Sequence, residues 1–178
     1  MSAKPGGGSR EDALLDVIER MRSRFFGKYR GVVIDVDAAT MRVKATVPAV
    51  LGQQSSGWAR PCVPFAGPNM GFAFLPDVGS GVWIEFEGGD VSLPIWVGGY
   101  WHDGEQPSDA TASVRAIVTK AGQKVLIDVD GGTVTVEDSN GNSVTFDSNG
   151  LSLAGGGQSI ALASSGVNVN QGAFEVTP

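Results

Sequence analysis

The sequence predicts an all-β protein that begins with a short helix, and three features of the chain support this fold class. Short runs of alternating apolar and polar residues, the pattern of half-buried strands, recur from residue 29 onwards. Many of the 26 glycines lie between these runs, where tight turns need them. Three of the four tryptophans fall in one stretch, residues 64–103, which we expect to form the core of a compact barrel.

The predicted barrel spans residues 27–108. We expect strands at residues 29–35, 41–47, 58–64, 71–75, 82–87 and 93–100, and a loop without a clear pattern at residues 48–57. The segment at 58–64 is interrupted by prolines, which cannot donate to a strand ladder, so it is expected at an edge of the sheet. Short antiparallel strands in a segment of this length suit a small closed barrel of the OB type.

The first 26 residues are predicted to form a flexible leader, residues 1–9, and an amphipathic helix, residues 10–24. Apolar residues spaced by four, three and four positions share one face of this helix, close to a coiled-coil seam: Leu14, Ile18, Met21 and Phe25. A helix this short is marginal in water by itself, so the stripe needs a partner. The partner could be the barrel, a second copy of the chain or another protein.

The composition and the spacing of the predicted strands change from residue 109, where we expect a stem that runs to residue 178. Aromatic residues become rare, and short strands alternate with turn clusters that place Gly132, Gly141 and Gly150 nine residues apart. From residue 134 onwards each strand offers two apolar side chains to one face. These residues are Val134, Val136, Val144, Phe146, Leu151, Leu153, Ile160, Leu162, Val167 and Val169.

A single ribbon of such strands has one apolar face and is not stable alone. Several copies wrapped around a common axis bring the apolar pairs together, and three copies make a triangular prism with a dry interior. We therefore predict an intertwined trimeric β-helix, with those ten residues as its core. Only 18% of the residues are charged, which also favours an oligomer.

The charge distribution and the lone cysteine exclude several classes of protein. No lysine or arginine follows Lys124, whereas six acidic residues do, so nucleic-acid binding by this half is not expected. The other interpretation of this asymmetry is solvation of a β-rich surface. Cys62 has no second cysteine to pair with and is expected to be a small buried apolar residue. Without a signal peptide or an apolar run of about 18 residues, we expect a soluble protein made in the cytoplasm.

The sequence predicts no catalytic residue, metal site or cofactor. Glu85 and Glu87 could form a carboxylate pair, but a solvated hairpin explains them better. The His102–Asp103 pair lacks a nucleophile, and the aspartate-rich turns lack the closing glutamate of a calcium loop.

The alternative function is a carbohydrate- or oligonucleotide-binding OB module on a fibrous stalk. Its binding face would expose aromatic residues with basic neighbours, and the candidates are Trp58, Trp83 and Trp101. Of these three tryptophans, only Trp58 has a basic residue close by in the sequence, Arg60.

One motif resembles a known family. It reads Pro76-x-Val78-Gly79-x-x-Val82, followed by Phe86, Gly88-Gly89-Asp90, Pro94 and Gly98-Gly99-Tyr100. Together with the helix before it and the stem after it, this motif resembles the baseplate assembly protein V family of contractile-tailed phages. It is also similar to the spike proteins of type VI secretion systems and of extracellular contractile injection systems. The resemblance covers nearly all of the chain from about Lys28.

The resemblance implies a homotrimeric central spike, assembled in the baseplate of a phage virion or an injection particle. The barrels would form a collar under the hub and tail tube, and the stem would be driven through the target envelope when the sheath contracts. The stripe of Leu14, Ile18, Met21 and Phe25 would then dock on the hub. Phe174 and Val176 would either seat a separate tip protein or simply close the stem core.

The sequence departs from some relatives in two ways. Some members of the family end in a tip that binds iron through paired histidines, but the only histidine here is His102, before the stem. Other members carry a lysozyme domain between barrel and stem, but here only residues 106–112 separate the two. We therefore expect no metal tip and no hydrolase, and a separate protein at the tip.

Overall fold

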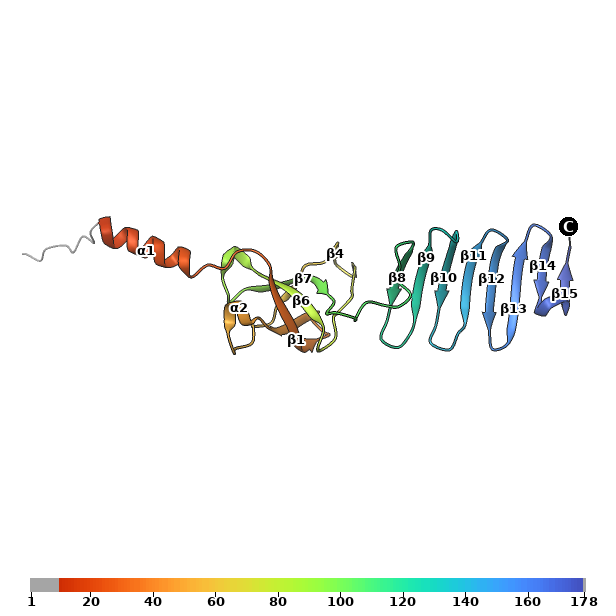
Figure 1. Ribbon diagram of the computed structural model, residues 1–178, viewed down its shortest axis with the longest axis horizontal. Coiled ribbons are helices and arrows are strands. Elements are labelled where there is room, and N and C mark those ends of the chain that lie inside the picture. The colour runs from red at the N-terminus through yellow and green to blue at the C-terminus, as the bar shows by residue number, and fades with distance from the viewer. Residues whose placement is uncertain (1–9, 178) are drawn as a thin grey trace, which may run out of the picture. The chain divides into compact units, whose positions relative to one another are not determined.

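The structure, a computed structural model, describes residues 10–177 and forms two compact units, Met1–Gly104 and Glu105–Pro178 (Figure 1). The first unit contains a helix and a small barrel, and the second contains a meander of short strands. The predicted flexible leader, residues 1–9, lies outside the described residues. The predicted domain limits after residues 26 and 108 stay predictions.

Helix α1 spans Arg10–Arg22 and has Glu11 and Asp12 in its first turn. Acidic side chains there stabilise the helix because they interact favourably with the positive end of its dipole. The prediction that Phe25 continues its apolar stripe is wrong. Beyond the helix, the Phe25 N–H donates a 2.9 Å hydrogen bond to the Gly89 carbonyl, and the ring packs against the barrel core and edge-on to Tyr29. Phe25 therefore packs with the barrel and is not part of the helix.

The barrel is built on a five-stranded sheet with the strand order β2-β1-β6-β7-β3. Its strands are β1 (Tyr29–Asp37), β2 (Arg42–Thr46), β3 (Arg60–Pro61), β6 (Gly81–Phe86) and β7 (Pro94–Tyr100). Between them lie helix α2 (Pro48–Leu51), the hairpin of β4 (Ala66–Gly67) and β5 (Met70–Gly71), and the 3-10 turn η1 (Glu87–Gly89). The strand β3 lies at an edge, as its prolines predict, and pairs in parallel with β7.

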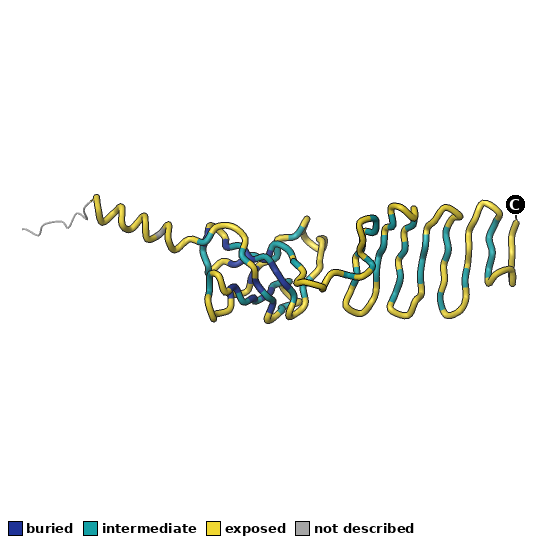
Figure 2. Tube along the Cα trace, viewed as in Figure 1, coloured by how far each residue is buried: buried dark blue, intermediate teal, exposed yellow. Residues whose placement is uncertain are grey.

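The barrel completes its own core, which Figure 2 shows as the dark blue segments. The buried apolar residues are Val33, Val43, Ala45, Val47, Ala59, Val82, Ile84, Phe86 and Trp96. They come from alternate positions of facing strands, as the period of two requires. The indole N–H of Trp96 donates to the Met41 carbonyl at 3.2 Å, which satisfies its polar atom inside the core.

Three local predictions in the barrel are wrong. The segment at residues 48–57 contains helix α2, whose first position Pro48 suits because its missing N–H is not needed there. Residues 72–75 form no strand, because the prolines in residues 64–76 limit the ladder to the two-residue hairpin of β4 and β5. Cys62 is exposed, because it points outward between half-buried Pro61 and Val63 while its N–H bonds to the Trp96 carbonyl.

The stem is one antiparallel sheet in which each strand pairs with the next along the chain. Its strands are β8 (Val114–Val118), β9 (Lys124–Asp128), β10 (Thr133–Glu137), β11 (Ser143–Asp147), β12 (Gly150–Gly155), β13 (Gln158–Ala163), β14 (Gly166–Val169) and β15 (Phe174–Val176). A 3-10 turn, η2 (Asn170–Gly172), precedes the last strand. In the described part of the second unit, the sheet forms a single layer (Figure 1).

Candidate functional site: an assembly face on the stem

Two rows of side chains run along one face of the stem sheet, and the strand register defines them. The first row is Arg115, Ile127, Val134, Phe146, Leu151, Leu162, Val167 and Val176. The second row is Ile117, Val125, Val136, Val144, Leu153, Ile160, Val169 and Phe174. We call the surface formed by both rows the apolar face. Fifteen of its sixteen positions are apolar, and Arg115 is the exception.

The opposite face of the same sheet is mainly polar from β10 to β14. Its central row contains Thr135, Thr145, Ser152 and Asn168, which pair across the strands or through Ala161. The hydroxyls of Thr135 and Thr145 lie 3.4 Å apart and share a hydrogen bond. Because successive side chains of a strand point to opposite sides, one register separates the two faces along the whole stem.

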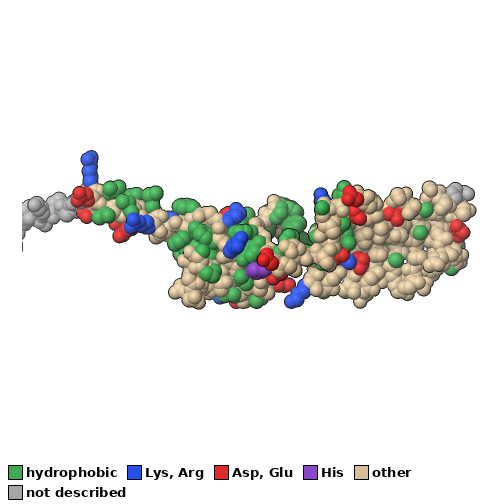
Figure 3. All heavy atoms as spheres, viewed as in Figure 1, with side chains coloured by type: hydrophobic (Ala, Val, Ile, Leu, Met, Phe, Trp, Pro, Cys, Tyr) green, Lys and Arg blue, Asp and Glu red, His purple; other side chains and the backbone are tan. Residues whose placement is uncertain are grey.

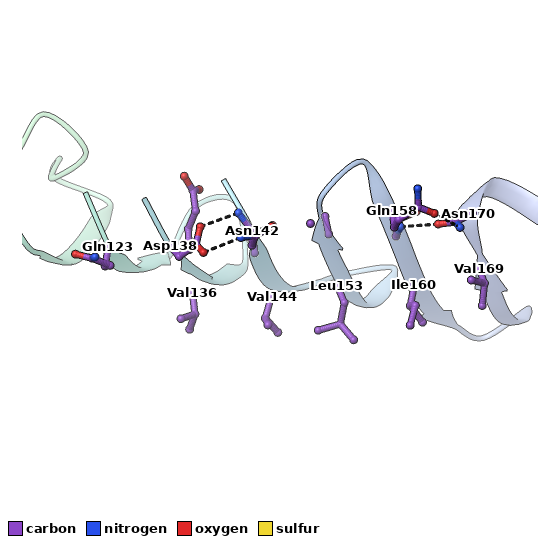
Figure 4. Close-up of a pocket in the computed structure, with 15 residues that line it drawn as sticks. Gln123, Val136, Asp138, Asn142, Val144, Leu153, Gln158, Ile160, Val169 and Asn170 are labelled. Carbon is purple, nitrogen blue, oxygen red and sulfur yellow. Dashed lines mark hydrogen bonds between the residues drawn. The ribbon is translucent and has the colours of Figure 1, made fainter. Parts of the chain in front are cut away.

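Carboxylate-centred turns hold this register. Asp138 Oδ1 accepts a hydrogen bond from the Asn140 N–H (2.8 Å). It also accepts from the Asn142 N–H (3.0 Å), and Asp138 Oδ2 accepts from the Asn142 side chain at 2.7 Å (Figure 4). These bonds favour the charged carboxylate, the Asn142 side chain most of all, so the pKa of Asp138 is lowered. Asp147 forms the same kind of turn with Asn149 and Gly150. A fixed turn prevents the one-residue slip that would exchange the two faces.

Within the described residues of the stem unit, no other segment covers the apolar face. None of the described residues between 105 and 177 is buried, and Val136 and Phe146 are 47% and 50% exposed. A groove of about 730 Å³ lies over the middle of the face, where Val136, Val144, Leu153, Ile160 and Val169 project to one side (Figure 4). An exposed apolar surface of this length is typical of a protein interface.

All ten residues predicted to form the stem core lie on the apolar face, and their burial in a trimer stays a prediction. The structure places five more apolar residues on this face, among them Ile117, Val125 and Ile127 from the first two strands. Sequence reasoning missed the orientation of β8 because its residues Val114, Ala116 and Val118 alternate as well. The pairing of Val114 with Asp128 places that set on the polar face.

The barrel has a shallow cleft of about 600 Å³ lined by Arg30, Trp83, Tyr100, Trp101, His102 and Asp103. The Arg30 guanidinium lies 5.7 Å from the ring centre of Trp83 and 5.8 Å from that of Tyr100. The basic neighbour of Trp58 is Lys44, 4.6 Å from the ring, rather than Arg60. The expectation that only Trp58 has a basic neighbour is therefore wrong, because pairing of β1 with β6 brings Arg30 to Trp83.

A second exposed surface of the barrel was not anticipated from the sequence. The segment at residues 64–78 exposes Phe65, Met70, Phe72 and Phe74, and the rings of Phe72 and Phe74 stack at 4.4 Å. Asp77 is the only charged residue between Arg60 and Glu85. This scarcity of charge, rather than any strand pattern, is the signal that could have identified an apolar surface.

The structure also places the polar residues that the sequence offered as catalytic or metal-binding candidates. Within residues 10–177, no group of three histidine, cysteine, aspartate or glutamate side chains could hold a metal ion. Glu85 is paired with Lys28 at 2.6 Å, and Glu87 lies in the turn η1 rather than on the strand beside Glu85. His102 lies edge-on to Tyr100 at 5.3 Å. No helix in the described part of the chain is long and apolar enough to span a membrane.

Two protein-family models match the chain. Residues 29–101 match the type VI secretion system/phage-baseplate injector OB domain, and residues 115–175 match the phage baseplate V C-terminal trimerisation domain. The two matched segments correspond to the barrel and to the stem sheet that carries the apolar face. A search of curated proteins found no match.

Proposed function

The chain belongs to the baseplate assembly protein V family of spike proteins, and we propose that it is the homotrimeric central spike of a contractile tail or injection system. The family makes it a structural component of a baseplate. The observation that carries the finer proposal is the apolar face, which runs through the segment matched by a trimerisation domain. In the proposal, the protein is made in the cytoplasm and assembled in the particle.

Burial of the apolar face supports association. Full burial of one valine, leucine, isoleucine or phenylalanine side chain contributes about 1.5–3 kcal/mol. Each chain offers fifteen such side chains on the face, so three copies that cover one another gain far more than association costs. Three chains suffice to enclose a prism, because each contributes one flat sheet with a single apolar side.

The mechanical role follows from the construction of the stem. Eight strands stacked about 4.7 Å apart give a shaft of roughly 33 Å, in which neighbouring strands are tied by backbone hydrogen bonds. The outward side chains are mainly small polar and acidic, and no lysine or arginine follows Lys124, so few basic groups would hold the shaft to an anionic membrane surface. On the face of the stem seen in Figure 3, basic side chains are visible only near β8 and β9. We propose that sheath contraction drives this shaft through the target envelope by force alone.

The oligomeric state of the full chain tests the proposal directly. Size-exclusion chromatography with light scattering should give three times the chain mass of 18.4 kDa at micromolar concentration. A monodisperse monomer would overturn the spike assignment.

The N-terminal helix is proposed to dock on the hub through Leu14, Ile18 and Met21. Leu14 and Met21 are 60% and 71% exposed, which supports a partner outside the barrel. Replacement Ile18→Asp should abolish attachment of the spike to the hub without changing the trimer mass, whereas Asp16→Asn, which changes the charge by the same amount on the other side of the helix, should leave attachment intact. Normal attachment of the Ile18→Asp protein would refute the docking role.

The last strand, β15, is proposed to seat a tip protein. Phe174 and Val176 prolong the two rows of the apolar face, and β15 pairs on one side only, with β14. Three such strands would offer apolar side chains and unpaired backbone groups together. Particles carrying Phe174→Ser should form normal trimers but lack tip density in cryo-electron micrographs. Retained tip density would leave the residues only the role of closing the core.

One observation favours a second function, binding of glycans at the barrel. Arg30 and the aromatic rings of Trp83, Tyr100 and Trp101 line one cleft, a composition that suits stacking on a sugar ring and bonding to its hydroxyls. Titration with surface glycans and with single-stranded DNA, followed by tryptophan fluorescence, tests it. Saturable binding that is lost in Trp83→Ala would support a recognition role in addition to the structural one.

A further inference from the structure

Arg115 is the one charged residue among the sixteen positions of the apolar face. Its Cα pairs with that of Ile127, so it belongs to the same row as Val134 and Phe146. It lies in β8, the first strand of the sheet, and therefore at one end of that row. The strand register therefore places Arg115 on the same side of the sheet as fifteen apolar residues, which is the side that the proposed trimer encloses.

The surroundings of Arg115 within one chain do not neutralise it. One guanidinium nitrogen, Nη1, donates a 2.6 Å hydrogen bond to the Ala112 carbonyl, and no ion pair is formed by Arg115 within residues 10–177. Two acids of the same unit are engaged elsewhere: Lys124 binds Asp109 (3.4 Å) and Glu137 (3.7 Å). Asp128 pairs with Val114 on the polar face, where its carboxylate accepts from the Gly131 N–H.

Trimerisation, on which this inference rests, repeats the arrangement three times around an axis. Three guanidinium groups then share the first layer of an otherwise apolar interior. Like charges in a region of low dielectric constant repel strongly, and a charge removed from water costs several kcal/mol unless it is paired. The layer therefore needs negative charge from outside the apolar face.

We propose that the three copies of Arg115 bind one inorganic oxyanion of the phosphate or sulfate class on the trimer axis. The planar guanidinium of an arginine carries the opposite charge to such an anion, and its N–H groups match two of the anion's oxygens. Three guanidinium groups around a tetrahedral anion donate hydrogen bonds to its oxygens. The negative charge of the anion offsets most of the repulsion between the guanidinium groups. The anion thus closes the end of the dry core at β8.

Phosphate binding to the intact full-chain trimer tests this inference. Isothermal titration calorimetry with inorganic phosphate, at constant ionic strength set with sodium chloride, should give one phosphate per three chains. Phosphate at about 100 times its dissociation constant should lower the equilibrium constant for trimer unfolding roughly 100-fold. Replacement Arg115→Gln should remove both effects and keep the trimer mass, whereas Arg42→Gln, on the barrel strand β2, should keep both effects.

The outcomes separate the anion site from the trimer itself. A trimer that binds no phosphate overturns the anion site and leaves the spike proposal intact. If Arg115→Gln weakens the trimer by the same factor with and without phosphate, Arg115 pairs with a carboxylate of a neighbouring copy and the anion site is again wrong. Arg115→Lys, which keeps the charge without the planar guanidinium, should bind phosphate more weakly than the native trimer; equal affinity would contradict the proposed geometry.

Discussion

The barrel and the stem are both made of short strands, yet they solve the problem of a hydrophobic core in opposite ways. The barrel curls one sheet around nine buried apolar residues that come from segments as far apart as Val33 and Trp96. The stem pairs each strand only with its neighbours in sequence and buries none of its described residues. The barrel is therefore a complete folding unit within one chain, whereas the stem presents half of a core.

This difference separates stability into two measurable quantities. Unfolding of the barrel depends on its own packing and should be independent of protein concentration. Unfolding of the stem should be coupled to dissociation and therefore depend on concentration. Substitutions that act on only one of these transitions show whether the two units are as independent as their cores suggest.

The largest effect is expected from a charge in the middle of the apolar face. Replacement Leu153→Asp places a carboxylate in each of three chains where the trimer offers no partner, at a cost of several kcal/mol per ion. The trimer should not form, and light scattering should report the mass of one chain, while Trp96 fluorescence still reports a folded barrel. Ser152→Asp, on the polar face of the same strand, should remain trimeric. A trimeric Leu153→Asp protein would show that the face is not the interface.

A cavity in the barrel should have the converse effect. Ile84 is fully buried, and Ile84→Ala should lower the free energy of barrel unfolding by about 2–5 kcal/mol in urea titrations followed by fluorescence. The trimer mass should not change. Ile34→Ala provides the matched control, since Ile34 is 43% exposed and its truncation should cost less than about 1 kcal/mol. Loss of the trimer in Ile84→Ala would mean that the two cores are coupled.

A smaller effect in the barrel is expected at Ser56, its one buried polar residue. Its hydroxyl accepts from the Ala45 N–H at 3.0 Å and donates to the Gly57 carbonyl at 2.7 Å. Ser56→Ala leaves the Ala45 N–H without this partner and should cost about 1–3 kcal/mol of barrel stability. Chemical denaturation of Ser56→Ala and of Ser56→Gly, which both lack the hydroxyl, should give similar losses relative to the native protein. A loss in the glycine variant alone would instead indicate a backbone effect.

Sequence patterns predicted those parts of the fold that depend on period and turn chemistry. Alternation placed Val43, Ala45 and Val47 on the buried face of the hairpin, and it placed all ten proposed stem-core residues on one face of the stem. Glycine and asparagine clusters marked turns that the structure forms around Asp138 and Asp147. These features are local, so the residues themselves contain the information.

Sequence patterns gave wrong or incomplete predictions where the position of a residue depends on a partner distant in the sequence. Phe25 has the right spacing for the helix stripe, but a hydrogen bond to Gly89 and contact with the barrel decide its position. Arg30 reaches Trp83 only through strand pairing. In β8, apolar residues occur at both even and odd positions, so alternation does not tell which set lies on the apolar face. Only the register with β9 shows that Arg115 and Ile117 share this face. The candidate anion site was therefore invisible before the register was known.

The smallest predicted effect concerns the turns that hold the stem register. The pKa of Asp138 is lowered below its usual 3.8, chiefly by the Asn142 side chain, so the carboxylate stabilises the folded stem in its charged form. A lowered pKa means that this contribution is fully present above pH 3.8 and is lost as the pH falls through the folded-state value. The melting temperature of the native stem should therefore fall more steeply in this acid range than that of Asp138→Ala. Asn142→Ala keeps the carboxylate but removes its largest hydrogen-bond donor, so its slope should lie between those of the native protein and of Asp138→Ala. Equal slopes for all three proteins would show that the Asp138 turn does not stabilise the stem through its charge.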